Sequence, residues 1–206
     1  MGEKLIIIGA GGHGKVIADI ARLNGYKEIY FLDDDTNKQF NGKYKVIGTL
    51  NDIKKYLNDY DFFVGIGDNQ IRQAVTKKLI ELNIKLPVLI HPSAIIDETV
   101  SIQSGTAVMA NVVINADTII GKGCIINTSS SIDHDCLINN YVHISPGSHI
   151  AGTVNIGDYT WIGIGSSVCN NLYICSSCVI GAGSVVVKNI VNSGKYIGVP
   201  TRRHEK

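Results

Sequence analysis

Isoleucine or valine stands at every sixth position through the second half of this chain. The series runs without a gap through sixteen positions: Ile96, Ile102, Val108, Ile114, Ile120, Ile126, Ile132, Ile138, Ile144, Ile150, Ile156, Ile162, Val168, Ile174, Ile180 and Val186. Even if a third of the residues were Ile or Val, chance would produce such a run less than roughly one time in ten million. The strict period therefore predicts a regularly wound backbone that directs one aliphatic side chain inward from each short segment.

The position two residues before each member of this series is mostly a small or β-branched residue. Side chains at positions i and i−2 of a strand lie on the same face, so both positions should point into the core. Cys124, Cys136 and Cys178 occupy this second position, and we interpret them as small core residues. Between these positions, Gly, Asn, Asp and Ser permit the left-handed backbone that a corner every six residues requires.

The first ninety residues follow a different pattern, in which apolar strands alternate with helical spacing. The expected elements are strands at 5–8, 28–32 and 61–66, a possible strand at 46–48, and helices at 16–23, 50–57 and 70–82. Alternation of this kind predicts a small Rossmann-like parallel α/β domain. We place the two domains at residues 1–90 and 91–206, with Pro87 and Pro92 around the crossing.

A glycine-rich turn follows the first expected strand. Residues 9–14 read Gly-Ala-Gly-Gly-His-Gly, which fits G-x-G-x-x-G, and Asp33 lies about twenty residues further on. Glycines let backbone amides approach a phosphate, and the N-terminus of a helix favours negative charge. The turn suits any nucleotide diphosphate. A nicotinamide dinucleotide, a nucleotide sugar and a purely structural turn remain open, and the short domain favours the nucleotide sugar.

Composition excludes several other classes of protein. With 19 Lys and Arg against 18 Asp and Glu, the net charge of +1 argues against a nucleic-acid binder. No apolar stretch is long enough for a membrane span or a secretory signal. The five cysteines do not form a disulfide scaffold, so we expect reduced thiols and a cytoplasmic protein. Cys175 and Cys178 have CxxC spacing, but no second CxxC and no nearby His completes a zinc site.

The chain as a whole resembles the bacterial nucleotide-sugar 4-amino N-acetyltransferases, a group that includes UDP-bacillosamine-pathway enzymes and sialic acid O-acetyltransferase relatives. The matching segments are residues 9–14, 31–34, 60–63, 65–67 with Asn69, 89–91, 126–130, 133–135 and 196–200. The resemblance implies that the second domain is a left-handed parallel β-helix of triangular section. Three hexapeptides would form one coil, giving about five coils between Ile96 and Val191.

In that family the small domain holds the nucleotide. By resemblance, Gly11, Gly12 and His13 would contact the diphosphate. Backbone amides and an imidazole can donate hydrogen bonds to phosphate oxygens, which agrees with this assignment. Asp33, Asp34 and Gly67 would contact the nucleoside end by the same resemblance. For the acidic residues, a polar turn at the end of a strand is the structural alternative.

The resemblance also assigns catalytic roles in the β-helix. His134 matches the general base, and Asp135 matches the acid that raises its basicity, although relatives usually carry Glu there. An amine that attacks a thioester must lose a proton, and imidazole titrates in the range where it can accept one. The remaining matches are to acetyl-CoA contacts and comprise His143, Gly152 as oxyanion donor, Ile164 and Ala182, with Lys188, Arg202 and Arg203 as weaker candidates for the CoA phosphates.

We therefore expect an acetyl-CoA-dependent enzyme that acetylates the 4-amino group of a UDP-linked 4-amino-4,6-dideoxy sugar. We expect a homotrimer with active sites between subunits, because a short prism exposes flat apolar faces. His143 and His149 should point out from different faces, no close-packed ligand spacing is present, and no metal is expected. The alternatives are a GDP- or dTDP-linked acceptor, O-acetylation of sialic acid, a nicotinamide-linked oxidoreductase and a non-catalytic β-solenoid.

Overall fold

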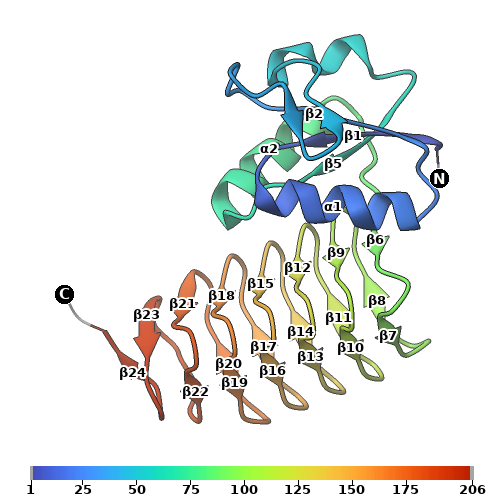
Figure 1. The fold of residues 1–206 in the computed structure, drawn as a ribbon. Coiled ribbons are helices and arrows are strands. Elements are labelled where there is room, and N and C mark those ends of the chain that lie inside the picture. Colours follow the sequence, from blue (N-terminus) through green and yellow to red (C-terminus); the bar gives the residue numbers. More distant parts are fainter. Residues whose placement is uncertain (1, 205–206) are drawn as a thin grey trace. The chain divides into compact units, whose positions relative to one another are not determined.

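The chain divides into two compact units, Met1–Pro92 and Ser93–Lys206. The structure is a computed structural model, and it describes residues 2–204. Figure 1 shows each unit in the colours of the sequence, with helices and a small sheet in the first unit and stacked short strands in the second.

The first unit is built around a three-stranded parallel sheet. Its strands are β1 (Lys4–Ile8), β2 (Glu28–Leu32) and β5 (Asp61–Val64), in the order β2-β1-β5. The central strand, β1, is completely buried over Leu5–Ile8, which explains why its sequence is a continuous aliphatic run. Helices α1 (Gly12–Leu23) and α2 (Asn69–Glu81) follow β1 and β5, and Asp68 caps α2 through two backbone amides. The predicted parallel α/β unit is confirmed.

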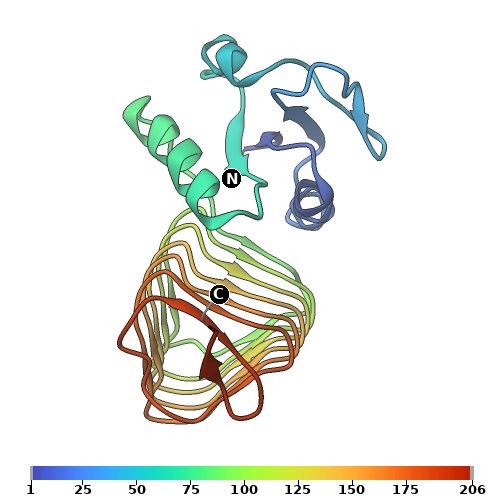
Figure 2. The same ribbon diagram turned by 90° about the vertical axis from the view of Figure 1, so that its left-hand side faces the viewer.

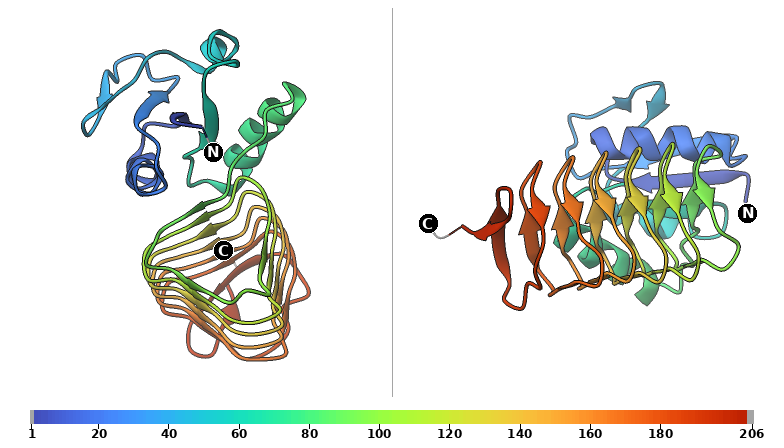
Figure 3. Two further views of the ribbon diagram at one scale, coloured as in Figure 1. Left: turned by 90° about the vertical axis from the view of Figure 1, so that its right-hand side faces the viewer. Right: turned by 90° about the horizontal axis from the view of Figure 1, so that it is seen from below.

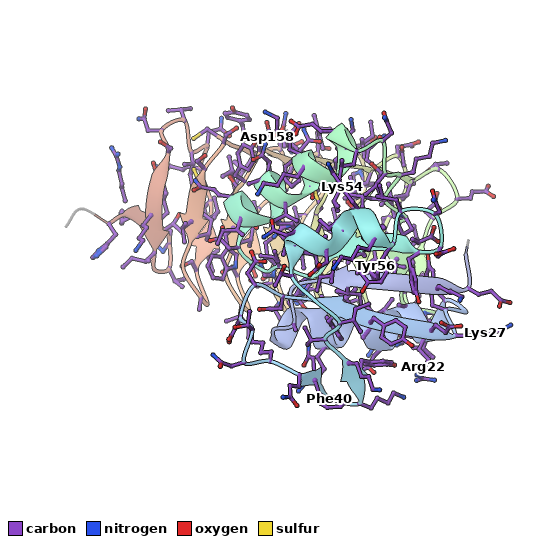
Figure 4. The ribbon with its side chains drawn as sticks, turned by 90° about the horizontal axis from the view of Figure 1, so that it is seen from above. Arg22, Lys27, Phe40, Lys54, Tyr56 and Asp158 are labelled. Atoms are coloured by element: carbon purple, nitrogen blue, oxygen red, sulfur yellow. The ribbon has the colours of Figure 1, made fainter. Side chains whose placement is uncertain are left out.

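Two details of this unit differ from the sequence prediction. The expected strand at 46–48 is wrong: a hairpin of β3 (Phe40–Asn41) and β4 (Tyr44–Lys45) ends just before it, and only Val46 bridges β2. The expected helix at 50–57 is a shorter 3-10 helix, η1 (Leu50–Lys55), which begins at a capping box formed by Thr49 and Asp52. Figure 4 labels Phe40 on the hairpin, where its side chain is exposed, and Tyr56 just after η1.

The second unit is a parallel β-helix with three faces, seen end-on in Figure 2 and on the left of Figure 3. The first face comprises β7 (Ile95–Ile96), β10 (Val113–Ile114), β13 (Ser131–Ile132), β16 (His149–Ile150), β19 (Ser167–Val168) and β22 (Val185–Val186). The second face comprises β8 (Ser101–Ile102), β11 (Ile119–Ile120), β14 (Leu137–Ile138), β17 (Asn155–Ile156) and β20 (Tyr173–Ile174).

The third face carries β9 (Ala107–Val108), β12 (Ile125–Ile126), β15 (His143–Ile144), β18 (Trp161–Ile162), β21 (Cys178–Ile180), β23 (Gly194–Ile197) and the antiparallel β24 (Arg202–Arg203). The short strand β6 (Leu89–Ile90) belongs to the first unit. We call the corner between the first and second faces edge 1–2, and the corner between the third and first faces edge 3–1. Within a face, each residue pairs with the residue one coil later, as His143 pairs with Trp161.

Every position of the aliphatic series from Val108 to Val186 is buried, which confirms the predicted core. Ile96 and Ile102, at the start of the stack, are half-buried. The right-hand view of Figure 3 shows the strands of consecutive coils lying in a parallel row. The six strands of the first face mark five complete coils from β7 to β22, in agreement with the estimate of about five coils between Ile96 and Val191. After β22 the winding continues into β23.

The corners adopt the left-handed backbone that the sequence predicts, including at residues other than Gly, Asn and Asp. Tyr141 and Tyr159 have φ of 57° and 60° at the same corner of successive coils. Their rings stack with centroids 5.7 Å apart and planes within 4°. Face-to-face contact between the rings offsets part of the cost of a left-handed conformation in a bulky residue.

Candidate functional site

Edge 1–2 borders a cavity of about 450 Å³ on the β-helix. Polar side chains from four successive coils line it, together with aliphatic residues. The lining residues are Asn115, Ser131, Asp133, His149, Ile150, Ala151, Ser167, Val168, Cys169 and Asn170. Since Asp133 precedes His134 and Ala151 precedes Gly152, the predicted base and the predicted oxyanion donor both adjoin this cavity.

His134 lies at edge 1–2 between two carboxylates. Its Nδ1 is 2.7 Å from Asp135 Oδ2, and its backbone N–H donates to Asp133 Oδ1 at 2.9 Å. Asn115 Nδ2 also donates to Asp133 Oδ1, at 2.9 Å, so the preceding carboxylate is held in place. Asp135 has φ of 57°, a left-handed conformation that turns the corner. The predicted His134–Asp135 pair is therefore present in the structure.

The Asp135 carboxylate raises the pKa of His134 above its ordinary value, chiefly through the hydrogen bond to Nδ1 and also through its charge and that of Asp133. This bond fixes the neutral tautomer with the proton on Nδ1, because a carboxylate accepts and does not donate. The Nε2 lone pair is then available. An imidazole in this state can take a proton from a substrate held beside it.

Gly152 lies directly against the His134 ring. It occupies the position one coil after His134, since Thr153 N–H donates to the His134 carbonyl oxygen at 2.9 Å. A Cβ on Gly152 would stand 2.6 Å from both Nε2 and Cε1 of His134, closer than real contacts allow. The absence of a side chain at this position leaves room for the imidazole. The carbonyl of Gly152 accepts from Asn171 N–H, whereas its own N–H has no acceptor within residues 2–204.

His143 lies on the third face and contacts a different set of residues. Its ring stacks on Trp161 with centroids 5.6 Å apart and planes within 3°. Nε2 of His143 is 3.1 Å from Asn127 Nδ2, and Trp161 Nε1 donates to Ser145 Oγ at 2.7 Å. The Trp161 side chain is 47% exposed. This stack presents a flat aromatic surface to a ligand on that face.

One chain does not bring all the predicted acetyl-CoA contacts together. Ile164 follows β18 and Ala182 follows β21, so both lie on edge 3–1, where both are exposed. His134 and Gly152 lie on edge 1–2 instead. These two edges flank the first face, and the predicted contacts therefore form two separate groups on one β-helix. His149 points outward from the first face, as predicted, and is 2.8 Å from Ser131 Oγ.

The glycine-rich turn of the first unit leads directly into α1, which begins at Gly12. A Cβ on Gly14 would overlap the Gly9 carbonyl oxygen, so the close approach of turn and helix needs glycine there. Gly11 and Gly12 instead face open space, with no atom within 4 Å of the place a Cβ would take. Open glycines at a helix N-terminus suit the approach of a phosphate group.

His13 is half-buried behind this turn with its Nε2 atom out of solvent contact, and no described residue forms a hydrogen bond with that atom. Burial, together with the nearby charge of Arg72, lowers the pKa of His13 to about 4. The imidazole is therefore neutral at physiological pH and can contact a ligand as a hydrogen-bond donor or acceptor. The Arg72 side chain is buried and donates to the carbonyl oxygens of Ile66 and Gly67, at 3.2 and 2.9 Å.

The two predicted acidic residues lie at the carboxyl end of β2 and take part in hydrogen bonds within the protein. Asp33 accepts from Ala10 N–H at 2.6 Å and forms an ion pair with Lys38 at 3.2 Å. Asp34 Oδ1 accepts from Leu50 N–H at 3.0 Å. A cavity of about 210 Å³ lies beside them, lined by Ile8, Gly9, Asp33, Asp34, Leu50, Ile66, Ile71 and Val75. Ligands of open α/β sheets bind in such crevices at the carboxyl ends of the strands.

Comparison with known proteins finds relatives of both units. A family model described as the PglD N-terminal domain matches residues 4–79. UDP-N-acetylbacillosamine N-acetyltransferase of Bacillus subtilis (strain 168) is 33% identical over 112 residues, which cover 52% of this chain and 52% of that enzyme. The match to this curated relative thus spans about half of its length.

Solved structures align with nearly the whole chain. The acetyltransferase domain of PglB from Neisseria gonorrhoeae FA1090, in complex with acetyl coenzyme A, is 39% identical with a TM-score of 0.96, over 99% of this chain and 100% of that chain. PerB from Caulobacter crescentus, in complex with CoA and GDP-perosamine, is 35% identical with a TM-score of 0.93, over 98% of this chain and 97% of that chain. The chain belongs to the nucleotide-sugar N-acetyltransferases.

Membership of this family confirms the resemblance and the acetyltransferase class predicted from the sequence. Three features of the acetyltransferase site were not predicted: the Trp161 ring on His143, the Asn115 contact to Asp133, and Cys169 in the cavity wall. The first two pairs are separated by one coil of the β-helix. The coil length inferred from the hexapeptide repeat would have identified both pairs, because residues one coil apart stack.

Residues 2–204 contain neither a metal-binding cluster nor a membrane-spanning helix. No group of three or more His, Cys, Asp or Glu side chains in this part of the acetyltransferase could hold a metal ion. Among the helices in the same residues, none is both long enough and apolar enough to cross a membrane.

Replacing Asp135 with Asn should lower the pKa of His134, because Asn keeps the size of the side chain but removes the charge that stabilises the imidazolium ion. The acidic limb of the pH profile of kcat/KM should then move to lower pH, with a lower plateau. The pKa is measured by NMR titration of the His134 Cε1 proton.

Asp117→Asn is the matched control, since Asp117 occupies the equivalent left-handed corner position one coil earlier. In that variant the pKa of His134 should equal that in the parent protein. An unchanged pKa of His134 in Asp135→Asn would contradict the assignment of Asp135.

Proposed function

We propose that this enzyme transfers the acetyl group of acetyl-CoA to the 4-amino group of a UDP-linked 4-amino-4,6-dideoxy sugar, in bacterial glycan biosynthesis. The observation that carries the proposal is the His134 imidazole, oriented by Asp135 and lying against Gly152, whose backbone N–H has no acceptor among residues 2–204. The Bacillus relative supports the UDP-linked acceptor. The free thiols of all five cysteines agree with a reducing compartment, and we place the reaction in the cytoplasm.

His134 acts as the general base in this proposal. The amine nitrogen attacks the thioester carbonyl, and Nε2 of His134 removes a proton from that nitrogen. The imidazolium ion that forms is stabilised by the Asp135 carboxylate on Nδ1. A pKa raised by this contact makes the imidazole a better proton acceptor, at the cost of a smaller neutral fraction below that pKa.

The backbone N–H of Gly152 donates to the oxygen of the tetrahedral intermediate. It is fixed by the stacking of consecutive coils and has no competing acceptor in residues 2–204. One donor of this kind is worth roughly 3 kcal/mol of transition-state stabilisation. His143, Ile164 and Ala182 hold acetyl-CoA, with the His143–Trp161 stack as its aromatic support.

The first unit binds the nucleotide. Gly11, Gly12 and neutral His13 donate hydrogen bonds to the diphosphate at the N-terminus of α1. Asp33 and Asp34 contact the nucleoside beside the 210 Å³ cavity, as does the Gly67 segment that Arg72 holds in place. Asp33 has a second role besides this contact. Its carboxylate accepts a hydrogen bond from the Ala10 N–H and so orders the glycine-rich turn.

A complete site requires a second copy of the chain, and we propose a homotrimer. The base lies on edge 1–2 and the acetyl-CoA contacts lie on the third face and edge 3–1, so the two groups flank the first face. In a closed ring with the first face turned toward the threefold axis, edge 1–2 of one copy meets edge 3–1 of the next. No Asp, Glu, Lys or Arg is among the outward residues of the strands of this face, which are Ile95, Val113, Ser131, His149, Ser167 and Val185.

A GDP-linked acceptor is the second candidate, because PerB aligns with 98% of this chain and was solved with GDP-perosamine. The chemistry at His134 is the same for both acceptors. Only the nucleoside end of the first unit distinguishes them.

Replacing His134 with Ala should lower kcat by about two to four orders of magnitude while leaving acetyl-CoA binding nearly unchanged, because only the proton acceptor is lost. Thiol release is measured for kcat and calorimetry for binding. Cys169→Ser is the control for a covalent mechanism, because Cys169 lines the same cavity. Direct transfer predicts activity within about threefold of the parent for Cys169→Ser, and a burst of acetyl-enzyme would contradict it.

Val113→Arg should convert the trimer to monomers and abolish activity, because it places a charge on the face turned toward the axis. Ile119→Arg is the matched control, six residues later on the second face and 47% exposed. Light scattering after size-exclusion chromatography measures the oligomeric state. The arrangement is wrong if Ile119→Arg dissociates the protein and Val113→Arg does not.

UDP should raise the melting temperature more than GDP or dTDP at equal concentration. A ligand at one hundred times its Kd adds about 2.7 kcal/mol to the free energy of unfolding, which a thermal-shift experiment detects readily. Asp34→Asn should reduce the shift, whereas Asp59→Asn, which lies outside the cavity lining, should not. A larger shift with GDP would favour the second candidate.

A further inference from the structure

Cys175 and Cys178 lie on either side of a tight turn between β20 and β21, with their sulfur atoms 3.4 Å apart. Ser176 and Ser177 form the turn, and Ser177 has φ of 59°. A four-residue turn brings its first and last Cα atoms within about 7 Å. Disulfides join Cα atoms about 4.4 to 6.8 Å apart, so this turn is within their reach.

The backbone around the pair is held on both sides. The Ser177 N–H donates to the carbonyl oxygen of Asp158, a residue labelled in Figure 4, at 2.8 Å. The Cys175 N–H donates to the Ile190 carbonyl oxygen at 2.8 Å. Thr160 Oγ1 donates to the Cys175 carbonyl oxygen and accepts from the Cys178 N–H, at 2.9 and 3.2 Å. The sulfur–sulfur contact therefore belongs to an ordered corner.

The same threonine arrangement recurs at an earlier corner without a second thiol. Thr106 Oγ1 donates to the Gly121 carbonyl oxygen and accepts from the Cys124 N–H, at 2.8 and 2.9 Å. Cys124 is buried like Cys178, but glycine occupies the place that Cys175 takes in the later coil. The protein thus contains an internal control, in which a buried cysteine has the same backbone setting but no neighbouring thiol three residues earlier.

We propose that Cys175 and Cys178 form a redox pair that peroxide converts to a disulfide and a thiol reductant restores. Both thiols are free in the structure, Cys175 is partly accessible to solvent, and Cys178 is completely buried. The accessible sulfur meets the oxidant, and the buried sulfur is already in contact with it. Neither residue belongs to the proposed acetyl-transfer machinery, so the inference is independent of the proposed function.

The chemistry proceeds in two balanced steps. The Cys175 thiolate attacks one peroxide oxygen, an S–O bond forms as the O–O bond breaks, and hydroxide leaves and takes up a proton as water. The Cys178 sulfur then attacks the Cys175 sulfur, an S–S bond forms as the S–O bond breaks, and water leaves with the Cys178 proton. Two thiols and one peroxide give one disulfide and two waters.

The order of these steps follows from the environment of the two sulfurs. Burial and the adjacent Cys175 raise the pKa of Cys178 to about 12, so Cys178 stays protonated and does not attack peroxide first. Its proximity to Cys175 makes it the resolving thiol. Attack by this adjacent thiol competes with further oxidation of Cys175 to sulfinic acid.

The test treats the full-length protein with a small excess of hydrogen peroxide and follows its intact mass. The expected product is lighter by two hydrogens, about 2 Da, and dithiothreitol restores the original mass. Peptide mapping after unfolding and alkylation should find residues 175 and 178 joined by a disulfide and therefore not alkylated. Cys124 should be alkylated, because it was not oxidised. A peptide carrying two or three extra oxygens at Cys175, or two alkylated cysteines there, would overturn the proposal.

Two variants distinguish this pair from other thiols. Cys178→Ser should lose the two-hydrogen product and accumulate oxidised Cys175, because the resolving thiol is absent. Cys169→Ser should still form the disulfide, since it removes only the exposed thiol elsewhere. Circular dichroism establishes that each variant is folded before oxidation. Formation of the disulfide in Cys178→Ser, or its loss in Cys169→Ser, would overturn the assignment.

Discussion

Most strands of the β-helix are only two residues long, so no coil could hold its shape alone. Contacts between successive coils hold these strands in place. Aliphatic side chains stack in columns inside the prism, and backbone groups in its walls form hydrogen bonds with the next coil. Thr153 N–H bonds to His134 and Asn171 N–H to Gly152 in this way. The rest of the second unit depends on this repeat, because it decides which residues become neighbours across a coil.

The chemistry follows from the same stacking. His134 and Asp135 are neighbours in sequence, but the imidazole has space only because the residue stacked on it is glycine. The bond from Asn171 N–H to the Gly152 carbonyl oxygen and the Asn115 contact to Asp133 are likewise contacts between coils. A rigid column therefore orients the proposed base and the proposed oxyanion donor to each other without a flexible loop, which is the kind of preorganisation that catalysis by positioning needs.

The fold could be predicted well from the sequence because the regularly spaced aliphatic residues are the ones whose burial stabilises the core. The sequence predicted His134–Asp135 because the contact is local. It failed at residues 46–48, where apolar character suggested a strand but the preceding hairpin left only one bridging residue. It also missed the Trp161 ring on His143, because the hexapeptide pattern was applied to inward positions and not to outward ones. To predict contacts between residues one coil apart, the number of residues in a coil must be used together with the hydrophobic pattern.

The stacking of Gly152 on His134 also limits how the length of such a chain can change. Adding one whole coil beyond Ala182 would leave every edge in phase, so the prism could lengthen there without moving any of the proposed site residues. A single hexapeptide inserted between His134 and Gly152 would instead rotate everything after it by one face. Gly152 would then no longer lie against the His134 ring. Edges 1–2 and 3–1 would no longer carry the residues that they carry now. Insertions into these proteins should therefore be whole numbers of coils wherever the positions of the proposed site residues are preserved.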